Sequence, residues 1–502
     1  MTEFTSPDFE PYRNLTARFR EIAYLASASS LLGWDQETYM PPQGIAFRAK
    51  QGAYFSARIH ELATSKEVGD WLMACEDKDL GDPVASANVR EWRHDYDREI
   101  KLETALVSEF KEATSLALAA WQKAREQSDF SIFSPHLENL VQLNHRKADA
   151  WGYDECRYDA LLETYERGAR ASQLDAVFGA LKPKVVEIVQ AAIERSKSIP
   201  GDLLEGDYPQ AAQTAFNREV AEAIGFDFDA GRIDTTAHPF CSGIAPGDVR
   251  LTTRYNERNF TSSLFGVLHE AGHGLYEQGL RPELYGTPCG EAVSLGIHES
   301  QSRLWENHVG RSRAFWERWL PRAVHYFPHL SKISIDEMTA AVNRAELSYI
   351  RVEADEATYD LHVMLRFEME KRLISGDLKV ADLPAAWNEE FETSFGLKVK
   401  QDSEGCLQDI HWSMGAFGYF PTYSLGNLNA SQLFAVAQKA AGVSAGLAGG
   451  DYAPLLDWLR KNVHQRGRQL LPDALMVATT GGPTRADFHL EHLRARYVRS
   501  EG

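Results

Sequence analysis

The chain of 502 residues carries 53 Lys and Arg against 72 Asp and Glu, which gives a formal net charge of −19. Because nucleic-acid binding depends on clustered basic residues that neutralise phosphates, this balance argues against a nucleic-acid partner. Apolar residues make up 44% of the sequence, too large a share for an acidic disordered chain, so a large buried core is expected.

The N-terminal segment and the cysteines bear on the compartment. Residues 1–13 lack the basic and apolar regions of a secretory signal, and no apolar run reaches the roughly 18 to 20 residues that cross a bilayer. The 5 cysteines are widely spaced and include no CxxC pair, which indicates core fillers in a reducing compartment. We therefore predict a cytoplasmic protein that does not span a membrane.

Long helices are predicted where proline is absent, because proline interrupts a helix interior. Proline-free stretches span 84–134, 136–182 and 329–383, and apolar residues recur there at helical intervals, as at Leu361 and Leu365. We therefore expect helices to dominate all three stretches.

The clearest strand signal is the segment 248–255, where apolar and polar residues alternate and β-branched residues are enriched. A helical pattern follows over 262–278, with Thr261 or Ser262 as an acceptable N-cap. These two elements predict a small sheet followed directly by a helix.

The segment 442–450 is rich in glycine and is predicted to be a loop between helices at 432–440 and 452–460. The sequence contains no internal repeat and no long linker. We predict a mainly α fold in one domain, residues 1–502, which could form two lobes around a central cleft.

The helix predicted at 262–278 carries the motif His269-Glu-Ala-Gly-His273, an HExxH sequence. Because four residues advance a helix by about 400°, both imidazoles project from one face and can bind one tetrahedral ion. Glu270 is displaced by one residue, so it can act as a general base on water instead of binding the metal. The alternative is a structural histidine pair, but buried histidines without partners are costly.

A catalytic zinc site needs a third protein ligand and an open fourth position. No HxxGxxH extension follows His273, so the third ligand must come from elsewhere. A second helical stretch downstream holds Glu291, Glu299 and Glu306. Glu299 lies 26 residues past His273, a spacing typical of zinc peptidases with a glutamate ligand on the next helix. Glu299 is therefore the predicted ligand, and Glu291 is the substitute. The alternative interpretation is that Glu299 is only a solvated carboxylate on a helix.

Further short motifs occur in order along nearly the whole chain. They are WDQETYMP at 34–41, HPF at 238–240, DVRLT at 248–252, HESQSR at 298–303, IRVEAD at 350–355, GCLQDIHW at 405–412 and GYFPTYSLG at 418–426. Together with HEAGH they resemble the carboxypeptidase Taq (M32) family of metallocarboxypeptidases. The number of ordered motifs makes this resemblance far more specific than HExxH alone.

The resemblance implies a mostly helical HExxH zinc-peptidase fold with a deep groove and a small β-sheet beside the active site. It also implies a homodimer that removes single C-terminal residues from peptides with broad specificity. One zinc ion per chain would be bound by His269, His273 and Glu299, and Co²⁺ is the alternative because the same ligands accept both metals.

A carboxypeptidase must recognise a free C-terminal carboxylate, which a planar guanidinium binds bidentately. The resemblance implies Arg351 as this group, with Arg250 as a second candidate. Arg351 could instead form an ion pair with Asp355, four residues further on, and Arg250 could equally be structural.

The tetrahedral intermediate of peptide hydrolysis needs a hydrogen-bond donor for its oxyanion besides the metal. Tyr423 resembles the family's candidate for this role. His238 or His411 could share the task, and His411 is also a candidate to contact substrate; each histidine could instead be an ordinary buried hydrogen bonder. Three carboxylates are expected to orient imidazoles or arginines: Asp248, Asp355 and Asp409.

Two rival hypotheses come from the same residues. One is an oligoendopeptidase that cuts internal bonds of short peptides, and the other is a catalytically silent helical scaffold with a structural metal. An intact Glu270 and the lack of a fourth protein ligand argue against the scaffold. The expected partners are peptides with a free C-terminus, and local cations must reverse the repulsion from the net charge of −19.

Overall fold

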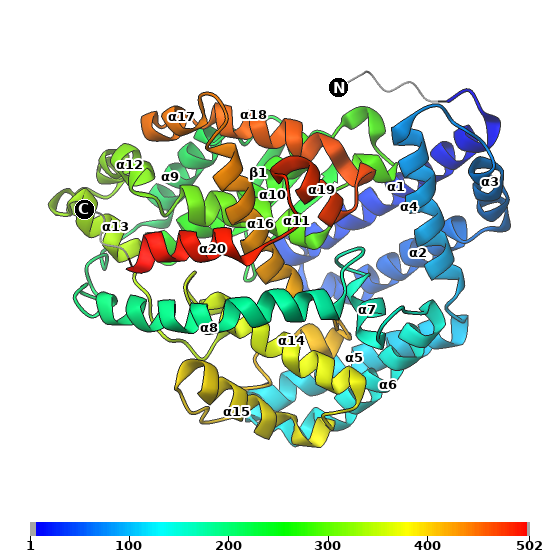
Figure 1. Ribbon diagram of the computed structural model, residues 1–502, viewed down its shortest axis with the longest axis horizontal. Helices are drawn as coiled ribbons and strands as arrows, with labels where there is room; N and C mark the ends of the chain where they lie inside the picture. The colour runs from blue at the N-terminus through cyan, green and yellow to red at the C-terminus, as the bar shows by residue number, and fades with distance from the viewer. Residues whose placement is uncertain (1–6, 499–502) are drawn as a thin grey trace.

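The computed structural model describes residues 7–498, and helices dominate it (Figure 1). The N-terminal helices are α1 (Glu10–Thr38), α2 (Ile45–Ala63), α3 (Lys66–Glu76), α4 (Pro83–Ile100), α5 (Thr104–Gln127), α6 (Ser134–Trp151), α7 (Arg157–Leu162) and α8 (Ala171–Ser196). The central helices are α9 (Gln210–Ala223), α10 (Phe260–Gly279), α11 (Leu295–Arg303), α12 (Arg313–Tyr326) and α13 (Ile335–Val342). The C-terminal helices are α14 (Tyr359–Ser375), α15 (Leu383–Phe395), α16 (Pro421–Ala437), α17 (Val443–Gly449), α18 (Ala453–Asn462), α19 (Pro472–Thr480) and α20 (Ala486–Leu493).

A three-stranded sheet lies beside α10. Its strands are β1 (Gly231–Thr235), β2 (Cys241–Ala245) and β3 (Asp248–Thr253). β3 is central, and it pairs in parallel with β1 and antiparallel with β2. Leu251 of β3 packs so closely on α10 that a Cβ at Gly274 would lie 2.9 Å from it. The predicted strand is confirmed, although it ends at Thr253, and so is the order of sheet and then helix.

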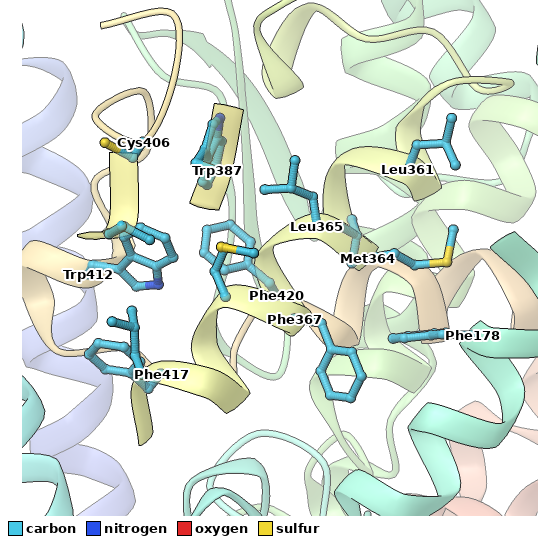
Figure 2. Packing of buried hydrophobic residues seen from close by; sticks show 14 of the residues in the cluster. Phe178, Leu361, Met364, Leu365, Phe367, Trp387, Cys406, Trp412, Phe417 and Phe420 are labelled. Atoms are coloured by element: carbon cyan, nitrogen blue, oxygen red, sulfur yellow. The ribbon is translucent and has the colours of Figure 1, made fainter. Parts of the chain in front are cut away.

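The buried apolar residues form two large clusters. One gathers side chains of α5 to α8, α14 and α15, and Figure 2 shows part of it, where Leu365 of α14 lies near Phe420 and Phe367 of the same helix lies near Phe178 of α8. The other gathers side chains of α9 to α13 and α18 around α10. Helix α16 belongs to both clusters, with Leu425 and Leu428 in the first and residues from Ala430 onward in the second. Helix α16 therefore joins the two clusters.

The predicted loop at 442–450 is wrong, because Val443–Gly449 forms the helix α17. Gly442 and Gly450 bound this helix in left-handed backbone conformations, with φ of 84° and 75°. Val443 is buried in the core, and this packing stabilises a short helix that the glycine-rich sequence alone would not form.

The prediction that helices dominate 329–383 fails in its middle, where residues 343–358 contain only the short 3₁₀ turn Arg351–Glu353. Backbone groups of this segment bind side chains instead of a helical ladder. The N–H of Arg351 donates to Gln408 Oε1, the carbonyl of Tyr349 accepts from Gln408 Nε2, and the N–H of Glu346 donates to Asp355. These long-range hydrogen bonds replace the helix.

Among residues 7–498, no helix combines the length and the apolar character needed to cross a membrane. The expectation of one domain, with the option of two lobes, stays a prediction.

Candidate active site

Helix α10 carries the HExxH motif. The structure moves its N-cap from the predicted Thr261 or Ser262 to Asn259, whose side chain accepts hydrogen bonds from the backbone N–H groups of both. This cap starts the helix at Phe260, and His269 and His273 follow on one face, with ring centroids 5.0 Å apart. The helix therefore presents two imidazoles side by side.

Glu299 of α11 completes a group of three ligand atoms. Its Oε2 lies 3.6 Å from His269 Nε2 and 3.4 Å from His273 Nε2, and all three atoms lie within 4.8 Å of one another. Among the described residues, these three side chains form the group of His, Cys, Asp and Glu residues that is arranged closely enough to hold a metal ion. The sequence-predicted ligands are thus brought together.

Two glycines allow Glu299 to reach the histidines. A Cβ at Gly272, inside the HExxH motif, would lie 2.5 Å from the carbonyl oxygen of Gln301 in α11. A Cβ at Gly426 of α16 would lie 2.4 Å from Cγ of Glu299. Real Cβ atoms do not approach so closely, so α10 and α16 hold α11 between them only because both positions are glycine.

The substitute ligand Glu291 lies outside this group. It precedes α11, which begins at Leu295, and its carboxylate accepts a hydrogen bond from Arg468 at 3.4 Å. Glu306 lies closer, in a π-helical turn after α11, and its Oε2 is 2.9 Å from His269 Nδ1. Glu306 is therefore placed to orient a ligand and not to bind the metal.

Two of the three predicted ligands, His273 and Glu299, have protonation states that suit a divalent cation, whereas a metal ion must displace a proton from the third, His269. Burial lowers the pKa of His273 to about 4, which leaves this imidazole neutral. Burial would raise the pKa of Glu299, but Arg303 and His269 outweigh it and hold that pKa well below its usual range. Burial also lowers the pKa of His269, but Glu299 and Glu306 reverse the shift and raise it to about 9. A donor set of two imidazoles and one carboxylate fits a catalytic zinc site.

Glu270 stands next to these ligands and is 6% exposed. Burial raises its pKa to about 7, against the effect of His269, which lowers it. A carboxylate with a pKa near neutrality can both accept and return a proton, as a general base requires.

Arg351 lies in a second, buried part of the site. Its Nε and Nη2 donate to the same carboxylate oxygen of Asp409 at 3.0 and 2.8 Å, and its Nη1 donates to the hydroxyl of Tyr359 at 2.7 Å. The alternative pairing with Asp355 is absent, because that carboxylate instead accepts backbone N–H groups of Glu346 and Thr358. The hydrogen bonds to Asp409 and Tyr359 fix the guanidinium in one orientation.

Arg303 and Tyr359 connect the two parts of the site. Arg303 donates from Nε to Glu299 Oε1 at 2.7 Å, and its guanidinium lies 4.4 Å from the ring centre of Tyr359. The hydroxyl of the same tyrosine accepts from Arg351. Only one arginine and one tyrosine therefore separate the predicted metal ligand from Arg351. Neither residue was predicted from the sequence as part of the site, although Arg303 stands four residues after Glu299, the spacing of neighbours on a helix face.

Tyr423 and His411 lie together near Arg351. The Tyr423 ring centre is 4.9 Å from the Arg351 guanidinium, and its hydroxyl is 3.4 Å from His411 Nε2. Tyr423 also precedes Gly426, the position that touches Glu299, by about one turn of α16. Burial and the charges of Arg351 and Arg366 outweigh Asp409 and lower the pKa of His411 to about 4, so this imidazole is neutral.

Arg250 and His238 are placed differently. Arg250 donates two 2.8 Å hydrogen bonds to Asp248 and stacks on Trp34, 4.2 Å from its ring. Strand alternation puts Arg250 on the opposite sheet face from Leu251, which packs on α10. His238 is exposed in the loop between β1 and β2. The structure therefore does not gather these two residues with Arg351 and the histidines.

Known proteins with similar sequences show the family to which the chain belongs. Residues 14–497 match the model of the family described as carboxypeptidase Taq (M32) metallopeptidase. The chain belongs to this family. The Thermostable carboxypeptidase 1 of Thermus thermophilus is 43% identical to this carboxypeptidase Taq chain over 501 residues, covering 97% of the chain and 98% of the relative. The Carboxypeptidase 1 of Bacillus subtilis is 36% identical, with 95% and 96% covered.

Solved carboxypeptidase structures share the fold. The M32 carboxypeptidase of Deinococcus radiodurans has a TM-score of 0.94 at 36% identity, covering 97% of this chain and 98% of that one. The carboxypeptidase of Pyrococcus furiosus has a TM-score of 0.95 at 33% identity, covering 98% and 100%. The family identified from the motifs and the mainly α fold with its small sheet are thus confirmed. This carboxypeptidase Taq chain is a metallocarboxypeptidase, and its family implies a divalent metal.

Proposed function

We propose that this enzyme uses one zinc ion per chain to remove single residues from the C-termini of peptides, with broad side-chain specificity. His269, His273 and Glu299 would hold the ion. The observation that carries the proposal is the buried Arg351, two side chains away from Glu299 through Arg303 and Tyr359. A fixed cation so close to the metal ligands would admit a terminal carboxylate next to the bond that is cut.

The chemistry proposed for the site divides between the metal and the protein. A bound zinc ion would supply Lewis acidity that lowers the pKa of a water molecule. Glu270 takes a proton from the attacking water and returns it to the leaving amine, for which its pKa of about 7 is suited. Arg351 binds the terminal carboxylate of the peptide, and the hydroxyl of Tyr423 donates a hydrogen bond to the carbonyl oxygen under attack.

The other predicted residues have secondary roles in this proposal. His411, which lies 3.4 Å from the Tyr423 hydroxyl, orients that hydroxyl and lines the substrate position. His238 could share the role of oxyanion donor only from an exposed loop, and Arg250 could contact substrate only from the far face of the sheet. We propose that both contribute less than Arg351, because neither lies with Arg351 and the two histidines of the HExxH motif.

A matched pair of peptides tests the proposed function. One peptide has a free C-terminus, the other is amidated, and both are incubated with the enzyme with and without a chelator. We expect stepwise loss of single residues from the free peptide only, abolished by the chelator and restored by Zn²⁺. Internal fragments from both peptides in mass spectrometry would identify an oligoendopeptidase instead. Absence of any chelator-sensitive cleavage would favour a structural metal.

The metal and the assembly are tested separately. Elemental analysis of the purified enzyme distinguishes Zn²⁺ from Co²⁺, which the same ligands accept. We also propose, from the family resemblance, a homodimer in the cytoplasm, and sedimentation of the purified protein measures its oligomeric state.

A further inference from the structure

The two ligand histidines have different partners at their second ring nitrogen. Both direct Nε2 toward Glu299, so both must carry a proton on Nδ1 when Nε2 binds a metal. His269 Nδ1 lies 2.9 Å from a carboxylate oxygen of Glu306. His273 Nδ1 lies 2.5 Å from Nδ1 of His298, so an imidazole stands where a carboxylate is usual.

With a metal on His273 Nε2, the contact between His273 and His298 allows only one arrangement of protons. The two facing Nδ1 atoms can share a single proton, and a metal on His273 Nε2 assigns that proton to His273. His298 must then accept at Nδ1 and carry its own proton on Nε2. That atom lies 2.8 Å from Glu277 Oε1, which accepts it. Every donor in the chain from His273 to Glu277 thus meets an acceptor.

Packing holds this chain of hydrogen bonds in place. His298 lies between two rings, with its centroid 4.6 Å from that of His273 and 5.2 Å from that of Tyr276. Glu277 follows His273 by four residues on α10, so both point the same way. Its carboxylate lies against β2, where a Cβ at Gly243 would come within 2.4 Å of Oε2. The chain therefore runs from the predicted metal ligand to the sheet.

We propose that His298 and Glu277 are positioning residues that fix the tautomer and the ring orientation of His273 for metal binding. The proposal rests on the proposed role of His273 as a ligand. His298 and Glu299 are consecutive on α11, so side chains of this one helix contact both ring nitrogens of His273. This positioning role accounts for the histidine of the HESQSR motif, His298, which takes no part in the proposed reaction itself.

The test is the dissociation constant of Zn²⁺, measured by competition with a chromophoric chelator on the full chain. His298→Phe keeps a ring against Tyr276 but removes both hydrogen bonds, and we expect it to bind Zn²⁺ about 10- to 100-fold more weakly. His298→Gln can accept from His273 and donate to Glu277, so it is expected to recover part of this loss. Glu277→Gln is expected to weaken binding less, and to add nothing to His298→Phe, because Glu277 acts through His298.

His464→Phe is the matched control. His464 is buried and stacks on the same Tyr276, with centroids 4.9 Å apart, but its Nε2 meets Gln301 and not a metal ligand. We expect this variant to keep the wild-type Zn²⁺ affinity. The visible spectrum of the Co²⁺-loaded protein should change in His298→Phe and stay unchanged in His464→Phe.

The outcomes separate this inference from the proposed function. His273→Ala is expected to lose Zn²⁺, and retained binding would overturn the ligand assignment itself. Loss of Zn²⁺ in His273→Ala together with wild-type affinity in His298→Phe would overturn only the positioning role. Equal losses in His298→Phe and His464→Phe would also overturn it, because they would indicate packing damage. If His298→Phe does not fold, wild-type affinity in Glu277→Gln overturns the proposal.

Discussion

The two ends of the active site are built in contrasting ways. The metal end takes its predicted ligands from two regular helices, α10 and α11, and the side chains that hydrogen-bond these ligands lie between His269 and Glu306. The carboxylate end takes Arg351 from an irregular segment and pairs it with Asp409, 58 residues away in the chain. Helical spacing organises the first end, whereas buried ion pairs between distant segments organise the second. Mutations should therefore affect chemistry at one end and affinity and stability at the other.

The largest effect is expected at the metal end, from Glu270→Gln. Removing a general base should lower kcat about 10²- to 10⁴-fold, because the attacking water loses its proton acceptor. The metal content should stay at the wild-type level, since Glu270 is not a predicted ligand. Steady-state kinetics and elemental analysis of the same preparation measure both, and wild-type hydrolysis would exclude Glu270 as the base.

At the carboxylate end, Asp409→Asn should mainly lower stability. Burial would raise the pKa of Asp409, but Arg366 and Arg351 outweigh it and hold that pKa well below its usual range. Breaking a buried pair of this kind should cost about 3–5 kcal/mol in the free energy of unfolding, measured by urea titration. Asp248→Asn is the control, because its partner Arg250 is part-exposed and the pair should be worth only about 0–1 kcal/mol.

The same Asp409 variant should change the response of stability to acid. Because the folded state depresses the pKa of Asp409, its contribution is present above the unfolded value of about 3.9 and is lost as the pH falls toward the folded pKa. Unfolding free energies below pH 4 should therefore fall less steeply in Asp409→Asn than in the wild type. An equal slope in both proteins would contradict the depressed pKa.

Arg351→Met is expected to have a smaller effect, on binding. Loss of the buried guanidinium should reduce kcat/KM for peptides with a free C-terminus about 10²-fold, since the carboxylate loses its partner. Arg351→Lys keeps the charge but not the paired donors, and should recover only part of the activity. Equal losses of kcat/KM on free and amidated peptides would show that Arg351 does not bind the terminal carboxylate.

Arg250→Met should produce the smallest change. Its guanidinium is already held by Asp248 and Trp34 on the far sheet face, so kcat/KM should fall less than about tenfold. The comparison with Arg351→Met on the same free peptide ranks the two candidates. A larger loss of kcat/KM in Arg250→Met than in Arg351→Met would indicate that the substrate carboxylate binds at Arg250, on the sheet.

The metal end was the more predictable of the two. The HExxH spacing placed His269 and His273 correctly because helical pitch is a local property. The structure brings Glu299, and not Glu291, to the histidines, and its role as the third ligand stays a prediction. The residues that orient these ligands, Glu306 and Arg303, were not assigned, because their partners are set by how α10 and α11 meet.

The carboxylate end depended on the resemblance to a family. The residues alone offered an ion pair of Arg351 with Asp355, at a helical spacing, as the alternative to a substrate-binding role, but that segment is not helical. Hydrogen bonds to Gln408 hold it in an irregular path and bring Asp409 into place. The prediction of a loop at 442–450 was wrong for a related reason, because burial of Val443 outweighed the weak local helix propensity of that segment.

The sequence by itself determined the family, the mainly helical character and the pair of imidazoles on one face of α10. Only the tertiary structure decided which distant side chains complete them. Glu299 reaches the histidines because Gly272 and Gly426 let three helices approach, and Arg351 faces Asp409 because two irregular segments share one buried space. Helix spacing follows from neighbouring residues, whereas the partner of a buried charge depends on everything packed around it.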